Sequence, residues 1–150
     1  MFTKTIKYTD FNGVERKEAF YFHLSENEVV EMEFGTNGGY TELLNKIIAA
    51  KDQESLLKEI KKFIHKAFGE KSSDGRRFMK SEEISRAFSE TPAFTKLYME
   101  FLFNDVAFAE FVNAIIPTNV SNTIKKHIEA SNEVKAQMSA VPTDANFANQ

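Results

Sequence analysis

Three phenylalanine-rich helical patterns follow the charged, glycine-marked segment 71–81, and they constrain the fold more than any other feature. The chain holds fifteen Phe and no Trp, and most of these rings recur at helical spacing, which is typical of a core. The patterns predict helices over 81–89, 92–103 and 105–116. Phe94 and Phe103 lie about 180° apart on the second helix, at roughly 100° per residue. A helix that is apolar on both faces is expected at the centre of the core.

The N-terminal segment predicts a β-hairpin over residues 2–24. Asn12-Gly13 stands between two extended runs, and this dipeptide is the strongest short hairpin signal because glycine accepts a positive φ without steric cost. An isolated two-stranded hairpin is only marginally stable in water. We therefore expect this one to lie on helices or on a partner's sheet.

Two registers are open to this hairpin, and burial chooses between them. A two-residue loop would send Phe20 to the face opposite Ile6. A type I turn, with Gly13 in the left-handed position of a bulge, pairs Asp10 with Val14 instead. We predict the second register, because a slip of one residue would expose half of the rings. That register gathers the following apolar side chains on one face: Phe2, Ile6, Tyr8, Phe20, Phe22 and Leu24.

The remaining pattern is helical, which predicts an α+β, mainly α fold with the hairpin packed on five or six helices. Ser25, Asp52, Ser81 and Pro92 are start signals of helices, and Gly69 is interpreted as a left-handed C-cap. The earlier helices are expected over 25–34, 40–50 and 52–68. We predict one domain over 1–117, a peripheral or partner-docking helix over 118–140, and a flexible tail over 141–150.

The residue chemistry indicates that the chain is not an enzyme and holds no cofactor or metal. Without cysteine it has no disulfide, no thiol nucleophile and no zinc–thiolate site. Its three histidines are scattered, and no P-loop, HExxH or GxGxxG motif occurs. The net charge of −3 is spread over interspersed charges, which argues against nucleic acid. No apolar run approaches the ~20 residues of a membrane span.

Two sets of residues are candidates for contact with a partner protein. Arg76 and Arg77 are the one functional-looking pair, since guanidinium groups dock onto acidic side chains, although arginines also simply solvate a loop. After residue 117 the apolar stripe falls to about one residue per turn, which is too thin to belong to the same core. A helix with so little to bury often docks elsewhere. The stripe consists of Val120, Ile124, Val134 and Met138.

Several motifs together resemble a known family. They are Tyr8-Thr9-Asp10-Phe11-Asn12-Gly13, Phe20-Tyr21-Phe22-His23-Leu24, Asp74-Gly75-Arg76-Arg77-Phe78-Met79-Lys80-Ser81 and Ile115-Ile116-Pro117. The chain resembles, over about residues 2–117, the tail assembly chaperones of long, non-contractile-tailed bacteriophages and prophages. These motifs are structural, and the family supplies no catalytic residue.

The resemblance implies a non-catalytic chaperone that binds the tape-measure protein and recruits tail-tube subunits formed by the major tail protein. It implies a protein that works in the cytoplasm of the bacterial host, associates with itself along its client and is absent from the mature virion. A structural virion protein, such as a tail-tube or head–tail connector component, is the alternative. A small enzyme would require a deep pocket with convergent polar groups.

Overall fold

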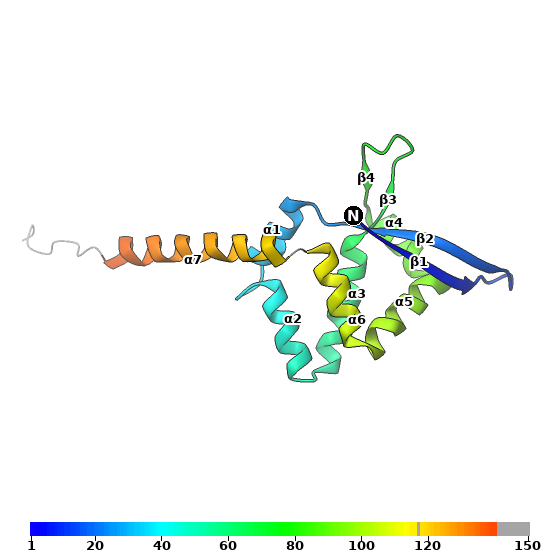
Figure 1. The fold of residues 1–150 in the computed structure, drawn as a ribbon, viewed down its shortest axis with the longest axis horizontal. Helices are drawn as coiled ribbons and strands as arrows, with labels where there is room; N and C mark the ends of the chain where they lie inside the picture. Colours follow the sequence, from blue (N-terminus) through cyan, green and yellow to red (C-terminus); the bar gives the residue numbers. More distant parts are fainter. Residues whose placement is uncertain (117, 141–150) are drawn as a thin grey trace, which may run out of the picture.

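The computed structural model describes the backbone of residues 1–116 and 118–140, and their side chains except those of 118–121, 125, 128, 139 and 140. An antiparallel hairpin of β1 (Phe2–Thr9) and β2 (Glu15–Phe22) packs on a helical body (Figure 1). The fold is therefore α+β and mainly α, as predicted. The other elements, in chain order, are α1 (Glu26–Phe34), α2 (Tyr40–Ala49), α3 (Gln53–Ala67), β3 (Phe68–Lys71), β4 (Phe78–Met79), α4 (Glu82–Ser89), α5 (Pro92–Phe103), α6 (Asp105–Ile115) and α7 (Thr118–Ala140).

The first hairpin has the predicted register. Gly13 donates its N–H to the carbonyl oxygen of Asp10 at 2.9 Å, and Asp10 donates its own N–H to the carbonyl oxygen of Val14 at 2.9 Å. The φ of Gly13 is 80°, a region that glycine enters without steric cost. Phe2 consequently lies opposite Phe22, and the apolar face of the hairpin joins the core as expected.

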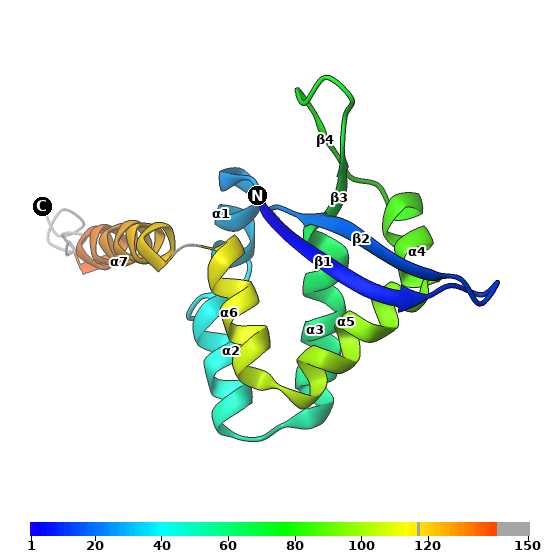
Figure 2. The same ribbon diagram turned by 45° about the vertical axis from the view of Figure 1, so that its right-hand side comes forward.

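The sheet is larger than predicted, because the segment that follows α3 pairs with the hairpin. Its four strands run in the order β1-β2-β3-β4, with Phe68 of β3 opposite Phe22 of β2. Short β4 then pairs with β3, so most of the charged segment 71–81 lies in a second hairpin, which ends at Met79, rather than in a loop between helices. This second hairpin projects from the body in both views (Figures 1 and 2).

The prediction that Gly69 is a left-handed helix cap is wrong. Helix α3 ends at Ala67, the next residue Phe68 is already extended, and Gly69 belongs to β3. A Cβ atom at Gly69 would lie 2.5 Å from the ring of Phe78 and 2.8 Å from the carbonyl oxygen of Met79. Glycine is required here because β4 approaches closely, and the sequence pattern of a glycine after a helix does not distinguish the two causes.

The core is aromatic, and Phe111 lies at its centre. Its ring contacts those of Phe2 and Phe22 on the sheet, at centroid distances of 5.3 and 5.1 Å. It also contacts Phe63 of α3 at 5.7 Å and Phe101 of α5 at 4.7 Å. Four elements therefore meet at one side chain of α6, and edge-on and tilted ring pairs of this kind add to the stabilisation from burial.

Side chains cap the N-termini of four helices, including the predicted caps Asp52 and Ser81. In α3, α4, α5 and α6 a side-chain oxygen accepts the backbone N–H three residues later and so satisfies an amide that has no partner within the helix. At α1 the predicted capping box between Ser25 and Glu28 is present, and Glu28 Oε2 accepts the N–H of Ser25 at 3.1 Å. The four caps are Asp52 with Ser55, Ser81 with Ile84, Thr91 with Phe94, and Asn104 with Ala107.

Helix α2 begins on a carboxylate supplied by α1, a contact that local sequence patterns do not predict. Glu33 is only 1% exposed. Its Oε2 accepts the N–H of Tyr40 at 3.2 Å, and its Oε1 accepts the hydroxyl of Thr41 at 3.3 Å. A carboxylate at this end of α2 also complements the helix dipole. The interaction spans seven residues, beyond the local spacing of a capping box.

Helix α5 is not buried on both faces. Phe94, Leu97 and Phe101 lie in the core, whereas Phe103 is 79% exposed and Met99 is partly exposed. The main neighbours of α5 are β1, α3, α4 and α6. The exposure of Phe103 shows that none of them covers its opposite face, so the apolar residues there reach solvent instead of a second core layer.

Helix α7 begins beside α1 and then extends away from the body (Figure 1). Ile124 is 7% exposed and belongs to the core, so the prediction that the stripe after residue 117 is too thin to join the core is wrong at this residue. The flexible tail predicted over 141–150 lies outside the described residues.

Candidate protein-binding surfaces

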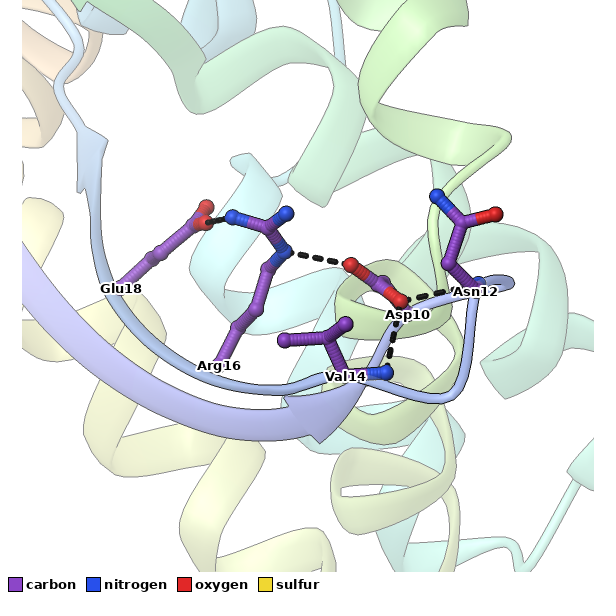
Figure 3. A network of polar contacts seen from close by, with 5 residues as sticks. All are labelled: Asp10, Asn12, Val14, Arg16 and Glu18. Atoms are coloured by element: carbon purple, nitrogen blue, oxygen red, sulfur yellow. Dashed lines mark hydrogen bonds and ion pairs between the residues drawn. The ribbon is translucent and has the colours of Figure 1, made fainter.

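The turn of the first hairpin is held by one carboxylate (Figure 3). Asp10 Oδ1 accepts the N–H groups of Asn12 and Val14, both at 2.9 Å. Its Oδ2 accepts Nε of Arg16 at 2.6 Å, and Nη1 of Arg16 lies 3.7 Å from Glu18 Oε1. The hydrogen bond from Arg16, followed by the one from the Val14 amide, lowers the pKa of Asp10. The side chain therefore keeps its charge and fixes the turn.

This ordered turn carries an exposed aromatic ring. Phe11 is 86% exposed, and Val14 beside it is also exposed. Phe11 was not among the residues predicted to bind a partner. Its position in the sequence indicates this exposure. A residue in the turn belongs to neither strand, so its side chain does not follow the alternation that places side chains on the inner face of the sheet.

The second hairpin presents the two predicted arginines. Ser72 Oγ donates to Asp74 Oδ1 at 2.7 Å and accepts the N–H of Arg77 at 2.9 Å, while Asp74 Oδ1 accepts the N–H of Arg76 at 3.1 Å. The hydrogen bond from Ser72 is the largest cause of the lowered pKa of Asp74. Arg76 and Arg77 are exposed, and neither forms an ion pair within the described part of the chain. The loop backbone is thus ordered while both guanidinium groups face solvent.

The outer edge of β1 lies beside a groove against α5. No strand pairs with this edge among the described residues. A groove of about 620 Å³ runs along it and is lined in part by the exposed apolar side chains of Met99 and Phe103. Lys96 of α5 donates from Nζ to the carbonyl oxygen of Lys7 at 2.6 Å, which satisfies one edge carbonyl. An edge strand of this kind can pair with another chain.

The stripe predicted on α7 is divided by the structure. Ile124 is covered by this chain's own core, whereas Val134 and Met138 are exposed, Met138 at 73%. The side chain of Val120 lies outside the described residues. The second hairpin and the far part of α7 project in different directions (Figures 1 and 2). Arg76 and Arg77 therefore do not share one surface with the exposed residues of α7.

The described side chains offer no metal site. No group of three or more His, Asp or Glu residues within residues 1–116 and 118–140 is placed to hold a metal ion. Of the helices in the same ranges, none has the length and apolar character that crossing a membrane requires. The described residues do include ordered turns with exposed side chains, an open sheet edge and a projecting helix.

The whole chain, residues 1–150, matches the model of a family described as phage tail assembly chaperone. The chain therefore belongs to the phage tail assembly chaperone family, which confirms the resemblance drawn from its motifs. No curated protein and no solved structure matches the chain. Membership of a chaperone family indicates a role in assembly rather than catalysis, with phage tail proteins as partners, exercised in the host cell during assembly.

Proposed function

We propose that this chain is a non-catalytic chaperone that binds the tape-measure protein and recruits tail-tube subunits to it. The observation that carries the proposal is the family match over all 150 residues. The structure supports it with exposed apolar and cationic side chains on separate surfaces. Two partners have to be held at once in this role, and separate surfaces allow it.

The far part of α7 is the proposed contact for the tape-measure protein. Its base is anchored by Ile124, while Val134 and Met138 remain exposed beyond the body. A helix with a thin apolar stripe gains burial by docking against another helix or into a groove. Under this proposal residues 1–117 form the folded domain and 118–140 form the docking helix.

Arg76 and Arg77 are the proposed contact for a second tail protein. Both are exposed at an ordered hairpin, so little conformational freedom of the backbone is lost when they bind. Arginine pairs with carboxylates in a bidentate geometry that lysine cannot reproduce. The open edge of β1 is the proposed site of self-association along the client.

Co-expression with the tape-measure protein from the same phage genome, followed by pull-down, tests the main proposal. We expect a stable complex and more soluble client. The double variant Val134→Ser/Met138→Ser is expected to weaken the complex, whereas Val106→Ser, at another exposed valine, should retain it. Absence of a complex with the full chain, together with no gain in client solubility, would contradict the proposal.

Mass spectrometry of purified phage particles distinguishes the chaperone from the alternative of a structural virion protein. A chaperone that leaves before maturation is expected to be missing from the particles. Recovery of this chain in amounts comparable to a tail component would favour the structural alternative.

A further inference from the structure

Five cationic side chains gather in a groove of about 690 Å³ between α3 and α4. Lys61, Lys62 and Lys66 come from α3, Lys80 lies two residues before α4, and Arg86 lies on α4. In the sequence these two groups are separated by the second hairpin, so charges that are interspersed along the chain become concentrated on one surface. This concentration is the feature that linear charge patterning did not reveal.

Much of this charge is not neutralised by the protein itself. Lys80 Nζ lies 2.6 Å from Oε2 of Glu28, and Arg86 has only a long contact of 3.8 Å with Glu90 on its own exposed helix face. Within the described ranges, Lys61, Lys62 and Lys66 form no ion pair. Glu82 is the one acidic residue in the lining. An anionic group that enters the groove would therefore meet several free ammonium groups.

The walls of the groove are fixed to each other. Ser85 Oγ of α4 donates to the carbonyl oxygen of His65 in α3 at 2.9 Å, and the His65 ring packs on Phe94 with 5.4 Å between centroids. Burial, and then the nearby charge of Lys61, lowers the pKa of His65. The groove is thus a preformed surface with a positive local field, and it needs no rearrangement before binding.

We propose that this groove binds an acidic segment of a partner protein. Carboxylates along such a segment would offset the mutual repulsion of the lysines, and the aliphatic stems of the lysines would cover its apolar atoms. A nucleic acid fits less well, because single-stranded binding relies on exposed aromatic rings for base stacking, and the one ring in this lining packs against Phe94. The groove is distinct from the second hairpin and from α7, so this inference does not depend on the tape-measure proposal.

Fluorescence anisotropy with a labelled Glu-rich helical peptide of about four turns, and with the same peptide carrying Gln for Glu, tests the inference. We expect the acidic peptide alone to bind, more weakly at about 0.15 M salt than at low salt because of screening. Lys62→Glu/Lys66→Glu should weaken binding by about tenfold or more. The single changes Lys58→Glu and Lys62→Glu form a matched pair, because Lys58 lies on the same helix but outside the lining, and only Lys62→Glu should weaken binding.

A second readout is the pKa of His65 by NMR, which should rise when the acidic peptide binds. Equal binding of the Gln peptide, or unchanged binding by the Lys62 and Lys66 variants, would overturn the proposal. Displacement of the peptide by a single-stranded oligonucleotide that binds more tightly would overturn it in favour of nucleic acid. If the double Glu variant fails to fold by circular dichroism, Lys62→Gln/Lys66→Gln decides between the same outcomes.

Discussion

The ring of Phe111 meets the ring of Phe22 edge-on, with 5.1 Å between their centroids and 80° between their planes. Through this pair, α6 holds the middle of the sheet against the helices. Because Phe111 also contacts Phe63 and Phe101, a single side chain links the hairpin to both α3 and α5. The hairpin is therefore not an appendage but part of the same core.

Phe111→Ala is expected to lower the free energy of unfolding by about 3–5 kcal/mol, because it leaves a cavity where four elements meet. Phe103→Ala, at an exposed ring, should change it by less than about 0.5 kcal/mol. Urea unfolding followed by circular dichroism measures both. Similar losses from the two variants would contradict the central position of Phe111.

Gly69→Ala is expected to destabilise the second hairpin by about 1–3 kcal/mol, because the added methyl group has no room beside the Phe78 ring and the Met79 carbonyl oxygen. In this variant, amide hydrogen exchange should become faster relative to the wild-type protein in β3 and β4, and much less so in β1. Ser73→Ala in the exposed loop of the same hairpin is the control and should leave exchange unchanged. Unaltered protection in Gly69→Ala would show that β4 does not approach β3 as described.

Arg16→Gln is expected to raise the pKa of Asp10 toward its ordinary value of 3.8, because the hydrogen bond from Arg16 is the main cause of the lowered pKa. Since the folded-state pKa lies below the unfolded value, the stabilisation by this carboxylate is complete above the unfolded value. It is lost as the pH falls through the folded-state pKa. NMR titration of the Asp10 carboxyl carbon measures the shift. Lys17→Gln, which removes the next charge along β2, is the control; an equal shift there would argue against a specific role of Arg16.

Ile124→Ala is expected to lower the free energy of unfolding by roughly 2–5 kcal/mol, because this residue of α7 belongs to the core. Val134→Ala on the exposed part of the same helix should leave stability within about 0.5 kcal/mol. Thermal unfolding of both variants at equal protein concentration tests the contrast. Equal and negligible effects would mean that α7 does not share the core.

The features that the sequence predicted are those specified by a few neighbouring residues. The register of the first hairpin follows from Asp10 and Gly13 together with the alternation of rings, and the caps at Asp52 and Ser81 need only the next three residues. The apolar residues of each helix likewise recur at helical spacing, which predicts the helix directly. These local signals agree with the fold, so they could be trusted without the structure.

The features that the sequence missed depend on which distant residues meet. The two residues of β4 form a strand only because Gly69 lets Phe78 approach β3. Phe103 was expected in the core and is exposed, whereas Ile124 was expected outside the core and is buried. Burial depends on which elements lie next to α5 and α7, and apolar spacing alone does not specify them. The basic groove is missed for the same reason, since its lysines converge only in the folded chain.

The network around Asp10 has a consequence for the ring beside it. A flexible loop that presents a phenylalanine must lose conformational freedom on contact, which weakens the contact. Here that freedom is already lost when the chain folds, because a single carboxylate accepts two backbone amides and a guanidinium. Whatever surface Phe11 meets, it meets as a rigid projection in a fixed direction.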